Sequence, residues 1–494
     1  MQNIPEIRLG LISVSRDCFP VTLSAQRRGK VAQACKEVGI DLYECPITVE
    51  NEVQAKTSVE DVLGHDVNAL IVYLGNFGPE TAETLIARFF DGPVMYVAAA
   101  EDSMNSLVDG RGDAYCGMLN CSYNLGLRNL KAYIPEYPVG TPKELAKMVG
   151  EFLPLATAWL GLKNLKIITF GPRPQDFLAC NGPIKGLFDL GVEIEENSEL
   201  DLLVAYRQHQ DDPRIPALIE EMTAELGEGN KMPGILPRLA QYELTLTDWA
   251  QTHKGSRAYV AFANKCWPAF QTEFGFVPCY VNSRLAAKGI PIACEVDIYG
   301  ALSEYIGLCV TQSPVTLLDI NNSVPADLYQ EEIAEKYDAR LEETFMGFHC
   351  GNTPICRLKK AEMRYQLIMK RSLEPDGEPD ITRGTLEGDL QEGSITFFRL
   401  QYTAAGELKA YVAQGQILPV PTHSFGGIGV FAIPEMGRFY RHVLIEKQYP
   451  HHGAVAFGHV GKVLFALFRL LGVKDIGWNQ PNTIPYPTEN PFVL

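Results

Sequence analysis

Residues 69–90 read ALIVYLGNFGPETAETLIARFF, which is an unbroken apolar run, a loop with two glycines and a helix-like segment. The run Ala69–Leu74 is typical of a strand that is buried on both faces. Residues 79–90 have helical spacing, with a proline near the start, where a helix tolerates it. A strand followed by a helix is the unit of a parallel sheet, so this stretch predicts an α/β fold.

The alternation of strands and helices continues on both sides of this stretch and restarts near Leu165. In the first third we expect strands at 7–14, 41–47 and 93–99, and a helix at 23–38. In the second third we expect strands at 166–170, 202–206, 257–263, 290–296 and 315–320, and helices at 215–226, 236–252 and 298–311. Two doubly wound, Rossmann-like α/β domains are therefore predicted, over residues 1–163 and 164–318.

The last third of the chain, residues 319–494, has a different pattern. Segments 394–403 and 407–420 flank the turn Ala404-Ala405-Gly406, which is typical of an antiparallel hairpin. A late helix is expected at 460–471. We predict a β-rich, barrel-like C-terminal domain that packs against the other two.

Composition and charge exclude several classes of protein. The 494 residues are 46% hydrophobic and 21% charged, and their net charge is −17. This acidic balance argues against a protein that coats nucleic acid or an anionic membrane. Residues 463–473 are apolar but too short to span a bilayer, and residues 1–10 lack the pattern of a signal peptide. With twelve scattered cysteines and no C-x-x-C pair, a cytoplasmic location is expected.

Nucleotide cofactors are not expected. The first strand ends in Ser13-Val14-Ser15-Arg16, without the glycine fingerprint of dinucleotide-binding domains. The chain also has no G-x-x-x-x-G-K-[ST] motif. The parallel sheets therefore predict another kind of ligand at the carboxyl ends of their strands.

Two carboxylates are the first candidates for catalysis. Glu295 stands at the end of an expected strand, and Asp319 ends the apolar run 315–318. Side chains at these positions can face a ligand crevice, although Asp319 could instead form an Asx turn. Asp297, two residues after Glu295, is more simply explained as a negative charge at a helix N-terminus.

Histidines are the second group of candidates. His451, His452 and His459 cluster in a segment with Gly453 and Gly458, which predicts a loop or short strand rather than a helix. His349 is a fourth candidate, although a lone histidine is usually structural. Two carboxylates and an imidazole suit Mn²⁺, Co²⁺ or Mg²⁺ better than the thiolate-rich sites that hold structural zinc.

At these residues the chain resembles the L-fucose isomerase / L-arabinose isomerase superfamily, and it is closer to the L-fucose isomerase branch. The resemblance consists of Glu295, then Asp319, then the C-terminal string around His452 and His459. It extends to Lys265-Cys266-Trp267-Pro268 and Asn282-Ser283-Arg284-Leu285. His451 departs from the pattern, because the fucose branch tends to carry asparagine there.

The resemblance implies a metal-dependent aldose–ketose isomerase that works through a cis-enediol. Glu295, Asp319 and His452 would hold the divalent metal, with Mn²⁺ the first expectation and His349 a further candidate ligand. Glu295 and Asp319 would also be the catalytic acid and base. Other residues are expected to contact the sugar, namely Arg16, Asn76, Phe77, Lys265, Trp267, His349 and His451.

The resemblance also implies a homo-oligomer, expected to be a hexamer, in which the Arg16 and Asn76–Phe77 loops of one subunit cover the pocket of another. The substrate would be a sugar like L-fucose or D-arabinose, or an anionic one such as a sulfonated hexose. Two other functions stay open from the residues alone. One is a non-catalytic sugar-binding or regulatory α/β protein, and the other is a glycosidase that uses paired carboxylates.

Overall fold

The computed structural model describes residues 3–108, 110–365 and 383–492, and the chain divides into two compact units. Pro5–Leu160 form one unit, and Gly161–Leu494 form the other together with the first four residues. The expected boundary after residue 163 coincides with the end of helix α5, Pro142–Lys163. The expected boundary after residue 318 falls inside strand β10, Thr316–Asn322, and the division of the second unit stays a prediction.

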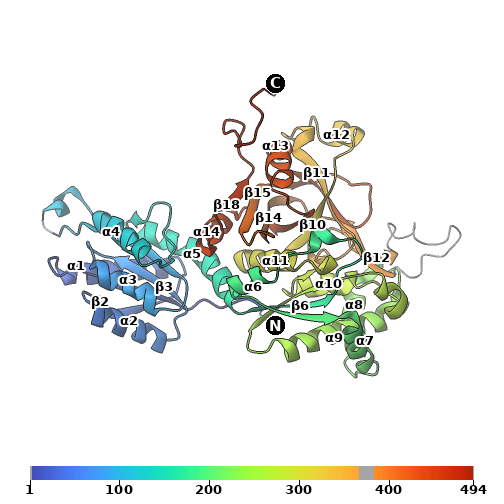
Figure 1. Cartoon of the computed structure of the whole chain (residues 1–494), viewed down its shortest axis with the longest axis horizontal. Coiled ribbons are helices and arrows are strands. Elements are labelled where there is room, and N and C mark those ends of the chain that lie inside the picture. Colours follow the sequence, from blue (N-terminus) through green and yellow to red (C-terminus); the bar gives the residue numbers. More distant parts are fainter. Residues whose placement is uncertain (1–2, 109, 366–382, 493–494) are drawn as a thin grey trace. The chain divides into compact units, whose positions relative to one another are not determined.

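The first unit is built on a parallel five-stranded sheet with the order β2-β1-β3-β4-β5 (Figure 1). Its elements are β1 Leu9–Val14, α1 Val21–Glu37, β2 Leu42–Val49, α2 Glu52–Gly64, β3 Ala69–Leu74, α3 Glu80–Phe89, β4 Val94–Ala99, α4 Ala114–Leu127 and β5 Val139–Gly140. Every residue of β1, β3 and β4 is buried, as the apolar sequence predicts. Strands β1 and β3 run in register and end together, which places the loops after Val14 and Leu74 side by side.

The second unit begins with a parallel four-stranded sheet of order β7-β6-β8-β9. Its elements are β6 Leu165–Gly171, α6 Lys185–Leu190, β7 Glu193–Ser198, α7 Glu199–Gln208, α8 Ile215–Leu226, α9 Leu236–His253, β8 Tyr259–Asn264, α10 Cys279–Ala287, β9 Ile292–Ala293 and α11 Ile298–Thr311. Both units therefore have the parallel sheets that the α/β pattern predicts.

A mixed nine-stranded sheet follows, with the order β12-β13-β16-β11-β10-β17-β14-β15-β18. Its elements and helices are β10, α12 Ala326–Glu332, β11 Thr344–His349, β12 Glu362–Tyr365, β13 Arg383–Asp389, β14 Gly393–Tyr402, β15 Leu408–Leu418, β16 Gly427–Ala432, α13 Met436–Phe439, β17 His452–Phe457, α14 Gly461–Leu471 and β18 Asp475–Trp478. Strand β15 also pairs with β16, and this pairing joins six of the strands into a closed ring. The hairpin expected around Gly406 is β14 and β15.

Helix α11 connects the two sheets of this unit. It packs against β8 of the parallel sheet and against β14 and β17 of the mixed sheet. All of its residues from Ile298 to Val310 are buried. The residues just before α11 are therefore held between the two sheets, and Glu295 and Asp297 lie there.

Two expected strands are corrected by the structure. Residues 202–206 belong to helix α7, which begins with a capping box formed by Ser198 and Asp201. The strand lies just before it, in the polar segment β7. The expected strand 290–296 is only the two residues of β9, after which Cys294–Val296 form a tight turn.

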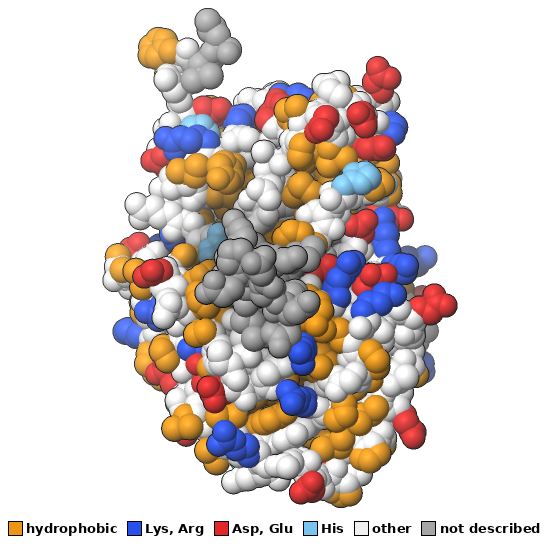
Figure 2. Space-filling view, turned by 90° about the vertical axis from the view of Figure 1, so that its right-hand side faces the viewer, with side chains coloured by type: hydrophobic (Ala, Val, Ile, Leu, Met, Phe, Trp, Pro, Cys, Tyr) orange, Lys and Arg blue, Asp and Glu red, His pale blue; other side chains and the backbone are white. Residues whose placement is uncertain are grey.

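Helix α5 is long and apolar enough to cross a membrane, but 56% of its apolar window is buried within the protein. A largely buried helix of this kind also occurs in the cores of soluble proteins. On the face shown in Figure 2, acidic, basic and hydrophobic side chains are interspersed, as on an ordinary globular surface.

Candidate functional site

Strand pairing brings Asp319 and His452 together. Strands β10 and β17 are antiparallel, and their register places these two residues directly opposite each other. Side chains at opposite positions project from the same face of a sheet. His452 Nε2 consequently lies 3.2 Å from Asp319 Oδ1. His349 ends the next strand, β11, and the His349 and His452 rings have centroids 6.0 Å apart.

Glu295 reaches the same point from the turn before α11. Its backbone is left-handed, with φ 59° and ψ 22°, and Val296 follows with φ 56°. Two such residues in succession cost about 1–3 kcal/mol each, and strain of this kind is concentrated at functional sites. The turn places Glu295 Oε2 at 3.6 Å from His452 Nε2 and at 3.5 Å from His451 Nε2.

The arrangement fits a divalent cation. His452 Nε2 and Asp319 Oδ1 are buried and make no hydrogen bond of normal geometry with any described residue. Two groups of candidate ligand atoms share His452, and within each group the atoms lie within 4.8 Å of one another. One group is Asp319, His349 and His452, and the other is Cys180, Glu295, His451 and His452. Carboxylate oxygens and an imidazole nitrogen are the donors that Mn²⁺, Co²⁺ and Mg²⁺ accept.

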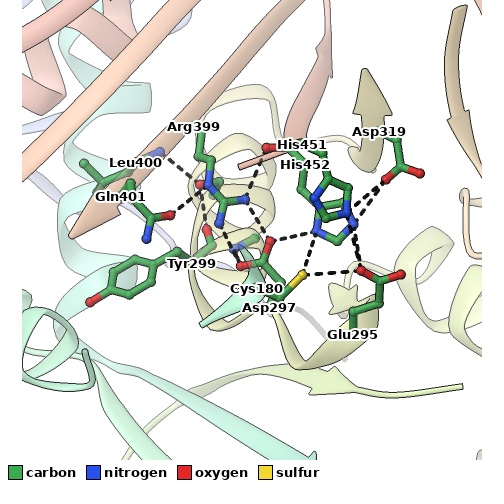
Figure 3. Close-up of polar contacts among 12 residues, drawn as sticks. Cys180, Glu295, Asp297, Tyr299, Asp319, Arg399, Leu400, Gln401, His451 and His452 are labelled. Carbon is green, nitrogen blue, oxygen red and sulfur yellow. Dashed lines mark hydrogen bonds and ion pairs between the residues drawn. The ribbon is translucent and has the colours of Figure 1, made fainter. Parts of the chain in front are cut away.

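The other nitrogen of His452 is held by a buried ion pair (Figure 3). His452 Nδ1 lies 2.9 Å from Asp297 Oδ2 and donates its hydrogen there, because a carboxylate only accepts. Both terminal nitrogens of Arg399 bind Asp297, at 2.8 and 2.9 Å. With Nδ1 engaged by Asp297, Nε2 is the nitrogen that faces Glu295 and Asp319.

The charges of this cluster shift its pKa values. Burial acts to raise the pKa of Asp297, but Arg399 and His452 outweigh burial and hold that pKa well below its usual range. Burial also acts to raise the pKa of Asp319, and the contact with His452 lowers it instead. The pKa of His452 is raised, because Asp297 and Asp319 outweigh burial, which lowers it. Asp297 and Asp319 are therefore ionised at neutral pH, and for Asp319 this is the form that can bind a metal.

The sequence did not single out Arg399 or Cys180 for chemistry, and it predicted only one of the two roles of Asp297. Asp297 was expected at a helix N-terminus, and it does accept from the Gly300 backbone nitrogen at 2.8 Å while also binding His452. Arg399 was missed, and the available signal was an arginine within the apolar strand β14. Cys180 was also missed, although its thiol donates to Glu295 Oε2 at 3.3 Å.

A cavity of about 420 Å³ opens beside the candidate metal ligands, within the range of small-molecule sites. Aromatic rings form part of its wall, with Phe177 and Trp267 edge to face at a centroid distance of 5.9 Å. The lining residues include Glu295, Asp319, Trp267, His349 and His451, all of them predicted from the sequence. Lys265 is not among the lining residues, and its Nζ lies 2.5 Å from Glu199 Oε2.

The remaining predicted residues form a cluster in the first unit. Arg16 accompanies Asn76 and Phe77 at the adjoining ends of β1 and β3. The Asn76 side chain accepts from the Arg16 backbone nitrogen at 3.0 Å and donates to Ser15 Oγ at 2.8 Å. The Arg16 guanidinium lies 4.9 Å from the centre of the Phe77 ring. Asn76 is thus a buried support for the loops, whereas Arg16 is partly exposed.

Comparison with known proteins gives two family matches. Residues 10–163 match the model described as fucose/sulfoquinovose isomerase, N-terminal domain, and residues 347–478 match L-fucose isomerase, C-terminal domain. The sulfoquinovose isomerase of Priestia megaterium is 24% identical over 490 residues, which cover 94% of this chain and 97% of that protein. The sulfoquinovose isomerase of a Clostridium species is 26% identical over 348 residues, covering 68% and 70%. Glu295 and Asp319 lie between the two matched ranges.

Proposed function

Because the chain belongs to the L-fucose isomerase family, we propose that it is a metal-dependent isomerase that interconverts a sugar aldose and the matching ketose. The observation that carries this proposal is the convergence of Glu295 and Asp319 on the unpartnered Nε2 of buried His452. These residues come from a turn and two strands that are far apart in the sequence. A structural role alone would not require three such polar groups to meet, with Glu295 and Asp319 in the wall of a cavity.

When bound there, a divalent cation, in the first instance Mn²⁺, supplies a positive charge that polarises the sugar oxygens at C1 and C2. The chain's own residues then move the protons. One of the two carboxylates, Glu295 or Asp319, accepts the proton from the carbon next to the carbonyl, and a cis-enediol results. That proton returns to the neighbouring carbon, and the other carboxylate helps to move a second proton, that of the hydroxyl group, from one of the two oxygens to the other. Asp297 and Arg399 keep His452 in one orientation throughout.

The substrate that we propose is a sulfonated aldohexose such as sulfoquinovose, after the relatives that carry this name. Phe177 and Trp267 offer aromatic surface to the apolar face of a sugar ring, and His349 and His451 offer polar contacts. The described residues that line the cavity include no lysine or arginine. A cation for the sulfonate would come from Arg16 of a neighbouring copy, in line with the family resemblance.

Helix α4 supports the proposal of a homo-oligomer. Its sequence, AYCGMLNCSYNLGL, has no charged residue, and the apolar residues at every fourth position are exposed, namely Tyr115 61%, Leu119 64%, Tyr123 67% and Leu127 65%. This spacing places them along one side of the helix. Copies with a net charge of −17 repel each other, so an uncharged face is where they can meet. On its buried side, Gly117 packs α4 directly onto the backbone of Phe77, so the helix itself lies next to one of the loops that would reach another subunit.

Replacing Leu119 by glutamate is therefore expected to break the assembly. A charge in the middle of an apolar contact is desolvated without a partner. Sedimentation should show an oligomer for the unmodified chain, expected to be a hexamer, and a smaller species for Leu119→Glu. Leu200 is the matched control, because it is 65% exposed on α7, and Leu200→Glu should leave the mass unchanged. A single-chain mass for the unmodified protein, or an unchanged mass for Leu119→Glu, would contradict the proposal.

The activity is tested by removing metal and adding it back. We expect the chelated protein to be inactive, and Mn²⁺ to restore conversion of sulfoquinovose to a ketose faster than that of L-fucose, D-arabinose or L-arabinose. Co²⁺ and Mg²⁺ are tested beside Mn²⁺ in the same assay. Undiminished isomerisation after chelation would refute the metal requirement, and sugar binding without any ketose would favour a non-catalytic binding protein. We place the enzyme in the cytoplasm, where such a metabolic reaction would occur.

A further inference from the structure

Cysteines gather on the side of the cavity next to His349. Cys266, Cys279 and Cys350 line the cavity, and Cys350 Sγ lies 3.8 Å from His349 Nδ1. Cys294 lies directly behind Cys266, with their sulfur atoms 3.6 Å apart. The isomerisation proposed above uses none of these thiols. Four thiols therefore lie together at a site where the proposed catalysis gives them no role.

The pair Cys266 and Cys294 is held by the parallel sheet. Strands β8 and β9 are neighbours, with Ala263 opposite Ala293, and each cysteine lies shortly after the carboxyl end of its strand. Both thiols are buried, with 7% of Cys266 and 2% of Cys294 exposed. A disulfide has a sulfur–sulfur distance of about 2.0 Å. The two sulfur atoms must therefore move closer together for a bond to form, while the pairing of β8 with β9 keeps the two segments adjacent.

We propose that Cys266 and Cys294 form a reversible disulfide when a small peroxide enters the cavity, and that this bond switches the site off. The loss of activity rests on the proposed function, whereas the bond itself does not. The sulfur of the Cys266 thiol attacks one peroxide oxygen, so that an S–O bond forms and the O–O bond breaks, and the thiol proton passes to the other oxygen, which leaves as water. The Cys294 sulfur then attacks the sulfenic acid, so that an S–S bond forms and the S–O bond breaks with loss of a second water. Two thiols are oxidised and one peroxide is reduced to two waters.

The bond would act through the backbone on Glu295 and on Trp267, the residues that follow the two cysteines. Cys294 directly precedes Glu295, whose left-handed conformation places its carboxylate beside His452. Cys266 directly precedes Trp267, which stands edge to face with Phe177 in the cavity wall. A covalent link pulls these two segments toward each other. We therefore expect the carboxylate of Glu295 and the indole of Trp267 to leave their working positions.

The test is a peptide map of the unmodified full-length protein after treatment with hydrogen peroxide and capping of the remaining thiols. The expected result is a cross-linked peptide pair containing Cys266 and Cys294, which dithiothreitol separates again. No cross-link under conditions that oxidise the exposed Cys18, or a cross-link to Cys279 or Cys350 instead, would overturn the proposal. This measurement needs neither a variant nor a known substrate, so its failure is distinct from failure of the proposed function.

Variants extend the test to activity. Cys294→Ala should make the enzyme resistant to peroxide, whereas the unmodified enzyme should lose most of its activity and regain it with dithiothreitol. Cys309 provides the matched control, because it is fully buried in α11 and does not line the cavity. Cys309→Ala should stay as sensitive as the unmodified enzyme. Equal sensitivity of Cys294→Ala and the unmodified enzyme would contradict the switch even if the bond forms.

Discussion

Glu295→Gln is expected to lower turnover by about 100- to 10,000-fold, which is the usual contribution of a positioned acid or base. Glutamine has the shape of glutamate but neither accepts the proton nor brings a negative charge to a cation. Glu295 Oε2 lies 3.6 Å from His452 Nε2 and accepts from Cys180, so the change removes a charge at the centre of the site. Turnover with saturating Mn²⁺ and the Mn²⁺ dissociation constant should both be measured, because turnover is expected to fall and the dissociation constant to rise.

Asp319→Asn should give a loss of similar size, since its Oδ1 faces the same nitrogen at 3.2 Å. Glu273→Gln is a matched control, because Glu273 is exposed and the substitution makes the same change of charge. The control should keep full activity and metal affinity. Full metal-dependent activity in either Glu295→Gln or Asp319→Asn would show that the assignment of ligands and of the acid/base pair is wrong.

The elements around the site could largely be predicted from local pattern. The apolar run Ala69–Leu74 is a buried strand as expected, and helix α11 begins and ends at the residues that its spacing predicts. The meeting of Asp319 and His452 could not be derived in this way. It depends on the register of an antiparallel pair whose strands are far apart in the chain, and no local signal specifies that register. Family resemblance, not spacing, pointed to this set of residues.

The errors have physical causes. The apolar residues 202–206 were interpreted as a strand, but the capping box at Ser198 starts a helix there, and the neighbouring strand β7 is polar because it lies at the edge of its sheet. Asp297 was interpreted only as a helix-terminal charge. Its second role depends on Arg399, which approaches from another sheet, and a single sequence does not reveal that partner.

Outside the proposed ligands, Asp297→Asn is the change expected to lower folding stability and metal affinity the most. Asp297 and Arg399 are each 1% exposed and form a two-point ion pair. Removing one charge leaves the other buried without compensation, which costs about 3–5 kcal/mol of folding free energy. Loss of a carboxylate behind a ligating histidine also weakens metal binding by about 10- to 100-fold. Urea unfolding and Mn²⁺ titration of the folded protein measure these two effects separately.

The double variant Asp297→Asn with Arg399→Met tests separately whether Asp297 orients His452 and whether it stabilises the fold. When both charges are removed, no buried guanidinium is left without a partner. The double variant should therefore lose less stability than the sum of the two single changes. Its metal affinity should stay low, because His452 still lacks the carboxylate that orients its ring. Glu332→Gln, which breaks the exposed pair with Lys336, should cost less than about 1 kcal/mol and serves as the control. If metal affinity recovered together with stability in the double variant, Asp297 would be a purely structural residue and His452 would need no orienting partner.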